Sequence, residues 1–239
     1  MSAIYLIRHG QASFGAENYD VLSPRGVEQS RALGRYFATR PVRLDAIYAG
    51  PPQRQRDTAR HLSLAAAELG GPLPAIAIAP ELDEYPAIEL LRKWLPALAA
   101  EDGELAAALG QMAQAGGGRP PSARTVQAAF EHIVARWARG ELDTGELETF
   151  AAFCERVSSG VRRIMAAEGR GRRIALVTSG GPISIAVRMC LGLTDERTLR
   201  LSWVIANASL TELRWREDEL SLLGFNAVHH LDDDLITYR

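Results

Sequence analysis

The stretch Ala3-Ile4-Tyr5-Leu6-Ile7-Arg8-His9-Gly10 opens the chain with five apolar residues that stop abruptly at an arginine, a histidine and a glycine. A short continuous apolar run is typical of a strand buried on both faces, as in a parallel sheet. In open α/β sheets, ligands bind beyond the carboxyl ends of the strands. The tripeptide Arg8-His9-Gly10 therefore stands where a ligand is expected.

Strand and helix patterns alternate after this run. Ser23-Pro24 is typical of a helix N-cap followed by a proline at the first helical position, and this helix is expected to reach about Ala38. A second strand is expected over residues 45–50 and a third over 75–79. A helix beginning near Arg54 separates them. This order predicts a parallel sheet with helices packed on it.

The middle of the chain has a different character. Residues 85–169 show no strand pattern, and their apolar residues recur at helical spacing. A short helix from Ile88 is expected to end at Pro96, and another helix is expected over 104–115. Gly116-Gly117-Gly118 follows it and is the expected flexible element. The block predicts a helical cap inserted into one domain of residues 1–239.

The strand pattern returns at residues 173–178, where Ser179-Gly180-Gly181-Pro182 turns the chain into a helix. Residues 207–215 and 219–226 are expected to form a hairpin. The predicted fold is α/β: a three-layer α/β/α sandwich with a mostly parallel central sheet and the inserted helical cap.

The composition is that of an ordinary globular protein, with 47% hydrophobic and 23% charged residues. The net charge of −2 gives no indication of a nucleic-acid or membrane partner. The N-terminus lacks the pattern of a signal peptide, so a cytoplasmic location is expected. Cys154 and Cys190 show no metal-ligand spacing and are expected to be buried thiols, although a disulfide between them stays open. The oligomeric state cannot be read from the sequence.

Three strand ends carry groups suited to an anion. Arg8 and Arg54 follow the first and second strands, and guanidinium groups bind phosphate through two parallel hydrogen bonds. Ser179 and Gly180 follow the later strand and open a helix, whose N-terminus favours negative charge. Gly10 would let the backbone approach a ligand closely. Together these residues predict a phosphate site.

His9 is a candidate nucleophile within that site. A neutral imidazole can take a phosphoryl group, and flanking cations lower its pKa and keep it neutral. Glu84, just after the third strand, is the best-placed carboxyl group to protonate the leaving alkoxide. Each residue alone has a structural explanation, such as a solvated arginine or a plain acidic turn. Their combination at strand ends favours the functional interpretation.

These segments resemble the signatures of the histidine phosphatase superfamily, also called phosphoglycerate mutase-like. The similar segments are Leu6-Ile7-Arg8-His9-Gly10-Gln11-Ala12, Leu22-Ser23-Pro24-Arg25-Gly26-Val27-Glu28-Gln29, the segment 50–59 and Leu82-Asp83-Glu84. The resemblance implies that His9 is the phosphorylated nucleophile and that Arg8 and Arg54 hold the phosphoryl oxygens. It implies that Glu84 is the proton donor, and no metal or organic cofactor is expected.

Two positions depart from the family pattern. The family usually has a second histidine directly before the two glycines of the later strand end, and this chain has Ser179 there. Loss of one such donor to the transition state can cost roughly 3–4 kcal/mol. Gly15 stands where many members have a ligand-binding asparagine, and Asn18 or Ser13 could substitute for it.

Three functions follow from this pattern. The first is a phosphatase that hydrolyses a phosphomonoester through a phosphohistidine on His9, with a small phosphorylated substrate or inorganic phosphate as its ligand. The second is a phosphate-ester-binding member whose catalysis is weakened or lost because of Ser179. The third is a phosphomutase, which ranks last because nothing in the sequence indicates the closed pocket that it needs. The physiological substrate is beyond the sequence, because it depends on the cap.

Overall fold

The computed structural model describes residues 2–13, 20–40, 43–103, 105–107, 123–217 and 219–238. The chain divides into two compact units. The first comprises Met1–Glu84 and Cys154–Arg239, and the second comprises Tyr85–Phe153. The second unit starts where the predicted cap starts but ends earlier than residue 169. The boundary falls inside α6 (Phe150–Glu168), a helix that continues into the first unit.

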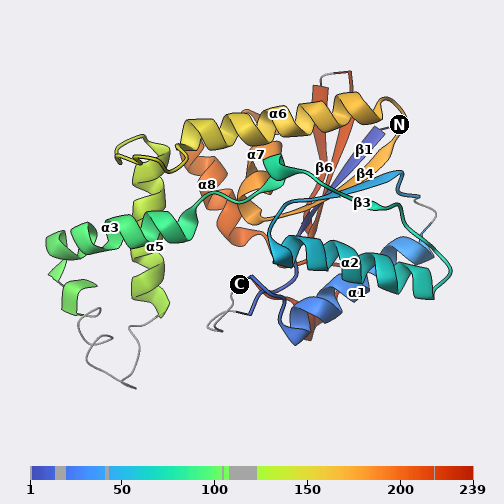
Figure 1. The fold of residues 1–239 in the computed structure, drawn as a ribbon, viewed down its shortest axis with the longest axis horizontal. Helices are drawn as coiled ribbons and strands as arrows, with labels where there is room; N and C mark the ends of the chain where they lie inside the picture. Colours follow the sequence, from blue (N-terminus) through green and yellow to red (C-terminus); the bar gives the residue numbers. More distant parts are fainter. Residues whose placement is uncertain are drawn as a thin grey trace. The chain divides into compact units, whose positions relative to one another are not determined.

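A six-stranded sheet in the order β3-β2-β4-β1-β5-β6 forms the centre of the first unit (Figure 1). Its strands are β1 (Ser2–Arg8), β2 (Ala46–Ala49), β3 (Ile76–Ile78), β4 (Arg173–Thr178), β5 (Leu210–Arg216) and β6 (Glu219–Ala227). The first four are parallel to one another, and β5 and β6 add an antiparallel hairpin. The predicted mostly parallel sheet is confirmed.

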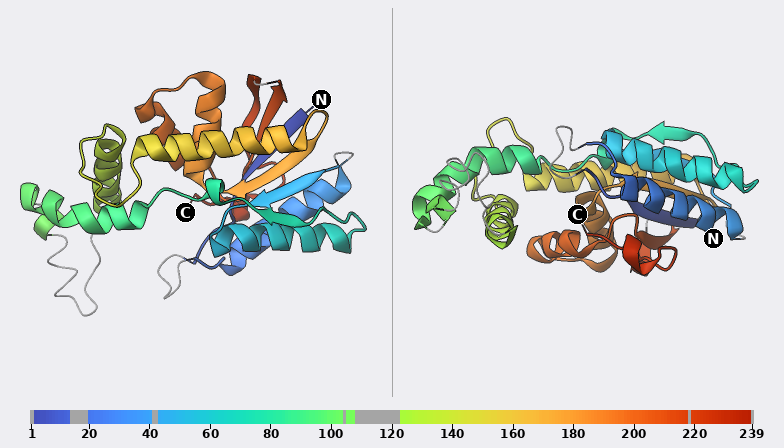
Figure 2. Two further views of the ribbon diagram at one scale, coloured as in Figure 1. Left: turned by 45° about the horizontal axis from the view of Figure 1, so that its top comes forward. Right: turned by 90° about the horizontal axis from the view of Figure 1, so that it is seen from below.

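Helices cover both faces of this sheet, which confirms the three-layer sandwich (Figure 1, Figure 2). The helices α1 (Pro24–Thr39) and α2 (Gln53–Glu68) lie on one face, and α6 and α7 (Gly180–Leu191) lie on the other. This arrangement follows from right-handed crossovers, because the chain moves outward along the sheet from β1 to β3 and then returns to β4. Ser23 caps α1, since its side chain accepts a hydrogen bond from the Gly26 N–H.

Both faces of the central strands are apolar, as the opening run of sequence predicts. On the α1 and α2 face, Ala3, Tyr5 and Ile7 of β1 pack in one cluster with side chains of both helices, and Leu33 and Leu62 of that cluster have no exposed surface. Ile4 and Leu6 alternate with them and are also buried. Burial on both faces fixes the register of β1, so the position where it ends is well defined.

The second unit is helical. It contains α3 (Ala87–Glu101), α5 (Ala123–Ala138) and the first residues of α6. Tyr85, Trp137, Phe150 and Phe153 form an aromatic cluster, in which the Tyr85 and Trp137 rings stack with their centroids 5.1 Å apart. These rings give the unit a core of its own.

Two expectations change in the helical regions. The prediction that Pro96 ends its helix is wrong, because α3 continues through it to Glu101. A proline inside a helix removes one N–H donor and strains one turn, and a helix can continue past it with a kink. The sequence interpretation also missed α8 (Asp195–Val204), a short helix between α7 and β5 whose N-cap is Thr194. Most of the segment 104–118 lies outside the described residues.

Three smaller features complete the fold. The 3₁₀ helices η1 (Pro80–Leu82) and η2 (Asp233–Leu235) follow β3 and β6. Cys154 and Cys190 are half-buried thiols that form no disulfide with each other, and they are less buried than expected. Burial raises the pKa of Cys190 to about 11. Among the described residues, no helix has the length and apolar character that a bilayer crossing requires.

Candidate active site

The sheet brings the predicted strand ends to one edge. β1 and β4 are parallel neighbours with Arg8 opposite Thr178, and the His9 N–H continues their ladder to the Thr178 carbonyl at 2.8 Å. On the other side of β4, β2 pairs with Ala49 opposite Val177. Since parallel strands end at the same edge of a sheet, the segments that follow β1, β2 and β4 meet there.

His9 is held in one tautomer by the backbone. Its side chain is 4% exposed, and Nδ1 lies 2.7 Å from the carbonyl oxygen of Gly10. A carbonyl oxygen can only accept, so Nδ1 carries the proton and donates it. The other ring nitrogen, Nε2, therefore keeps its lone pair, which is the atom that a nucleophilic histidine uses.

The surroundings of His9 also keep the ring neutral. Burial is the largest cause that lowers the pKa of His9 well below its usual value, and the positive charges of Arg54 and Arg8 lower it further. The hydrogen bond to Gly10 acts in the opposite direction but is the smallest contribution. A buried imidazole between two guanidinium groups cannot easily gain a proton, so the nucleophilic form predominates at neutral pH.

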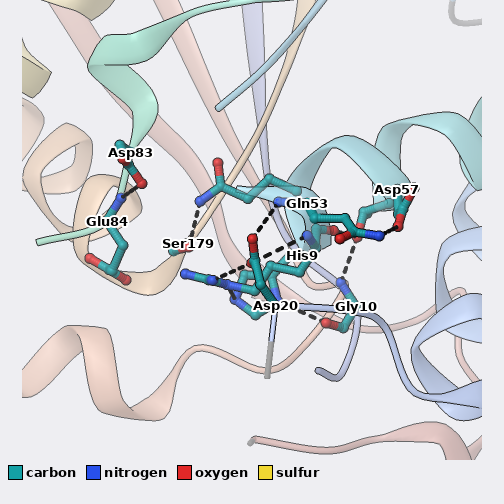
Figure 3. A network of polar contacts seen from close by, with 11 residues as sticks. His9, Gly10, Asp20, Gln53, Asp57, Asp83, Glu84 and Ser179 are labelled. Atoms are coloured by element: carbon teal, nitrogen blue, oxygen red, sulfur yellow. Dashed lines mark hydrogen bonds and ion pairs between the residues drawn. The ribbon is translucent and has the colours of Figure 1, made fainter. Parts of the chain in front are cut away.

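Arg54 reaches His9 from the first turn of α2. Its Nε donates toward His9 Nε2 at 3.3 Å, and its Nη1 forms an ion pair with Asp20 at 2.6 Å (Figure 3). Asp20 also accepts from the Gln53 N–H at 2.7 Å and so caps α2, whose own N-cap residue, Pro52, makes no side-chain cap. Asp20 fixes the direction of Arg54, a role that no local sequence signal indicates.

Arg8 lies on the opposite flank of the β1 end. Its Nη1 donates to the carbonyl of Ile205 and, at 3.0 Å, to the carbonyl of Tyr238 near the end of the chain. The structure thus places the Arg8 charge beside His9 but shows part of its guanidinium engaged by backbone carbonyls. The C-terminal segment as a positioning element for Arg8 was not predicted from the sequence.

Gly10 lies in close contact with the first turn of α1. A Cβ atom on Gly10 would lie 2.4 Å from the Gly26 carbonyl oxygen, and one on Gly26 would lie 2.1 Å from the Gln11 carbonyl oxygen. The Gly10 N–H donates to Thr58 Oγ1 at 2.9 Å, and Thr58 in turn donates to the Arg54 carbonyl. The expectation that Gly10 lets the backbone approach a ligand stays a prediction, and the close contact with Gly26 of α1 gives this glycine a structural role as well.

The three acidic residues that follow β3, Glu81, Asp83 and Glu84, make different contacts. Glu81 pairs with Arg163 of α6, whereas Asp83 accepts from the Glu84 N–H at 2.8 Å. Burial raises the pKa of Asp83, although its neighbours partly offset this. The carboxylate of Glu84 accepts from the Gly181 N–H at 3.2 Å, which places it at the first turn of α7. Glu84 is therefore not simply a solvated residue of an acidic turn, because its carboxylate is hydrogen-bonded to the start of α7.

A cation from α6 fixes the backbone of this turn. Arg156 Nη1 donates to the carbonyls of Glu81 and Asp83 at 3.0 and 3.1 Å. Thr178 adds a hydrogen bond from its hydroxyl to the Leu82 carbonyl at 2.6 Å. These contacts hold the backbone directly before Glu84 to both α6 and β4. Sequence reasoning missed Arg156, which lies more than seventy positions from its partners.

Ser179 and Gly180 stand at the end of β4 as predicted. Ser179 is 1% exposed, and its Oγ accepts from Gln55 Nε2 of α2 at 2.7 Å (Figure 3). Gly180 is buried, and a Cβ atom there would lie 2.8 Å from the Ser202 carbonyl oxygen of α8. Gln55 was not predicted, because a glutamine next to Arg54 looks like an ordinary helix residue.

The described ranges contain no group of three or more His, Cys, Asp or Glu side chains arranged to hold a metal ion. Gly15 and Asn18 lie outside those ranges. Ser13 lies within them, and its N–H donates to the Val21 carbonyl. The described site thus contains a neutral histidine, two arginines, the carboxylates of Asp20 and Glu84, and the neutral polar side chains of Gln55 and Ser179. That set can bind an anion and can move both a phosphoryl group and a proton.

Comparison with protein families assigns the chain. The model of the histidine phosphatase superfamily, branch 1, matches residues 4–102 and 117–228. The chain therefore belongs to the histidine phosphatase superfamily, as its motifs indicated. A search of curated protein sequences finds no match to this chain.

Solved structures show the same fold at low sequence identity. A phosphoserine phosphatase variant from Entamoeba histolytica, bound to phosphoserine, aligns with a TM-score of 0.64 and 16% identity, covering 97% of this chain and 100% of that one. A mycobacterial glucosyl-3-phosphoglycerate phosphatase aligns with a TM-score of 0.63 and 19% identity, covering 95% of this chain and 99% of that one. A phosphoglycerate mutase from Bacillus anthracis aligns with a TM-score of 0.62 and 16% identity, covering 94% of this chain and 92% of that one.

Proposed function

We propose that the protein is a phosphatase that hydrolyses a small phosphomonoester through a phosphohistidine on His9. The observation that carries this proposal is the state of His9: buried, neutral, with Nδ1–H fixed by the Gly10 carbonyl and Nε2 facing Arg54. Family membership supports the reaction class, and the phosphatases among the structural relatives support a small phosphorylated substrate.

In the first step, His9 Nε2 attacks phosphorus and the bond to the ester oxygen breaks. Arg8 and Arg54 bind the phosphoryl oxygens, whose negative charge competes with the Nε2 lone pair for the Arg54 N–H. Glu84 gives its proton to the leaving alkoxide. The phosphorylated imidazole is positive, and the Nδ1 hydrogen bond to the Gly10 carbonyl stabilises that charge.

In the second step, the Glu84 carboxylate takes a proton from water and the resulting hydroxide attacks phosphorus. The N–P bond breaks, inorganic phosphate leaves, and His9 returns to its neutral form. Glu84 serves as acid and then as base, so each turnover restores both groups. No step in this scheme needs a metal ion, and every proton has a donor and an acceptor.

The test is hydrolysis of an aryl phosphate in the absence of added metal. Wild type is expected to turn over, His9→Ala to lose activity, and His61→Ala, in the same unit but outside the site, to match wild type. An alkaline quench should trap on His9 a phosphate that is stable in alkali and is released in acid. Equal slow hydrolysis by wild type and His9→Ala would remove the catalytic proposal for this substrate class.

A second candidate is a phosphate-ester-binding protein with weakened or lost catalysis. Ser179 favours it, because the family's usual histidine at this position donates to a phosphoryl oxygen and carries charge, whereas a serine is shorter and neutral. Micromolar binding of a phosphorylated metabolite without turnover would select this candidate. A phosphomutase ranks below both, since the site by itself gives no sign of retaining a phosphorylated product.

A further inference from the structure

Ser179 occupies a helix N-cap position without acting as a cap. Its backbone is extended, with φ −115° and ψ 177°, yet its side chain makes no hydrogen bond to the first turn of α7. The Gly181 N–H, which a capping serine could bind, donates to Glu84 instead, and Pro182 has no N–H. The hydroxyl of Ser179 is therefore not needed by the helix that it precedes.

The partner of that hydroxyl is a fully buried amide. Gln55 has no exposed surface, and its Nε2 donates to Ser179 Oγ at 2.7 Å. Within the part of the chain that the structure describes, Gln55 Oε1 has no hydrogen-bond partner. Burying an amide with an unpartnered oxygen costs free energy that an apolar residue of similar length would avoid. Core packing alone does not account for a glutamine here.

The fold leaves a specific space for this amide. A Cβ atom on Gly50, directly after β2, would lie 1.9 Å from Gln55 Oε1, so any other residue at position 50 would displace the Gln55 side chain. The side chain of Gln55, in the first turn of α2, thus contacts both Gly50 after β2 and Ser179 after β4. Gly50, Gln55 and Ser179 form a unit that no local sequence motif joins.

The direction of the hydrogen bond decides where the Ser179 proton points. Because Oγ accepts from Gln55, its own proton must be directed to a different acceptor. Among the residues that the structure describes, no hydrogen bond takes this proton. Ser179 stands one position beyond Thr178, which pairs with Arg8, just as His9 stands one position beyond Arg8. A phosphoryl group on His9 would lie at the same edge of the sheet and would offer an oxygen as acceptor.

We propose that Ser179 is the hydrogen-bond donor to the phosphoryl group and that Gln55 is the residue that positions it. This inference rests on the proposed function, because the acceptor is the group that His9 receives. The pair replaces an ionisable donor by a neutral one, since neither an amide nor a hydroxyl titrates near neutral pH. Gln55 acts only through Ser179 and does not touch the substrate.

A double-mutant cycle tests the pair with an aryl phosphate as substrate. Ser179→Ala is expected to lower kcat about 100-fold, and Gln55→Met roughly tenfold, with KM little changed. The double variant should match Ser179→Ala alone, because Gln55 has nothing to position once the hydroxyl is gone. Additive losses, or no loss in Gln55→Met, would overturn the proposal. Thermal unfolding of each variant checks that the fold is retained.

The pH profile of Gln55→Glu gives a readout that a structural role would not move. A protonated carboxyl can donate to Ser179 Oγ, whereas a carboxylate can only accept and would turn the hydroxyl proton away from the substrate. The variant should therefore show a new loss of kcat as pH rises through the pKa of the introduced carboxyl. A profile parallel to that of wild type would contradict the positioning role.

Failure of this inference can be distinguished from failure of the phosphatase proposal. If His9→Ala abolishes turnover while Ser179→Ala and Gln55→Met leave it unchanged, only the donor pair is wrong. If wild type shows no turnover, the affinity for orthovanadate is measured in place of the rate of hydrolysis. Ser179→Ala and Gln55→Met should then each weaken vanadate affinity, roughly tenfold, without adding in the double variant. Unchanged affinity in both would overturn the inference on its own.

Discussion

The ends of β1 and β4 are neighbours in the sheet, yet they prepare their side chains in opposite ways. At the β1 end, His9 is a titratable group that burial and two arginines force into its neutral form. At the β4 end, Ser179 and its partner Gln55 cannot titrate at all. The comparison shows two ways to keep a polar side chain uncharged in the proposed phosphate site: burial and nearby cations suppress the ionisation of His9, whereas Ser179 and Gln55 have no ionisable group.

The largest expected effect comes from moving the histidine between the two ends. His9→Ser combined with Ser179→His should lower turnover by about 10⁴-fold or more, as losses of a nucleophile commonly do. At the β4 end no Gly10 carbonyl fixes the ring tautomer and no Arg54 faces the ring. Steady-state hydrolysis of an aryl phosphate measures this. Turnover within tenfold of wild type would show that the two strand ends are interchangeable.

The next effect concerns Glu84, whose carboxylate accepts a hydrogen bond from the Gly181 N–H in the first turn of α7, the helix that follows β4. Glu84→Gln should lower kcat about 10²- to 10⁴-fold for an alkyl phosphate, because the alkoxide then leaves without a proton. The loss should be much smaller for an aryl phosphate, whose leaving group is a weaker base. Comparing the two substrates with one variant isolates proton donation. Equal losses would assign Glu84 to binding or to structure instead.

A smaller effect tests whether the β4 end can accept an ionisable donor. Ser179→His alone should not raise turnover, because the Gln55 amide occupies the space beside Oγ. Adding Gln55→Ala opens that space, and the double variant should exceed Ser179→His by about tenfold. Both variants need thermal unfolding as a control. A gain from Ser179→His alone would mean that Gln55 moves aside readily.

The smallest effect is on stability against pH. Folding lowers the pKa of His9 and lowers that of His230 to about 4. Below the ordinary histidine pKa of about 6.5, the unfolded chain therefore binds more protons at these two residues than the folded protein does. The free energy of unfolding should fall as pH drops from about 6.5 toward 4. His230→Gln should remove about 1–3 kcal/mol of that decline. Chemical denaturation at several pH values measures it, and Ser179→Ala should leave the slope unchanged.

Much of the first unit was readable from the sequence because its signals are local. A run of apolar residues ending at Arg8 predicts a buried strand, and Ser23-Pro24 predicts the start of α1, where the structure has both. Pro96 shows the limit of a local rule, because α3 continues through it. A single proline is unfavourable in a helix, but tertiary packing decides whether the helix ends there.

The residues of the candidate site also separate into those with a local sequence signal and those that depend on tertiary contacts. His9, Arg54, Glu84 and Ser179 were placed by motifs at strand ends, where the topology of a parallel sheet brings distant segments together. Gln55 and Asp20 were not foreseen, because each depends on a partner from another element at hydrogen-bond distance. Spacing along the chain carries no information about such pairs. Only the folded geometry separates Gln55 from the other polar residues of α2.

The close contact between Gly10 and Gly26 changes how the opening motif should be used in reading other sequences. Both glycines are demanded by the meeting of two backbones, which any copy of this strand–helix junction must reproduce whether or not it turns over a substrate. A search that weights the glycines would thus retrieve active and inactive proteins alike. More informative about chemistry are the side chains proposed to contact the ligand and the residues that position them, and Gln55 belongs to the second group.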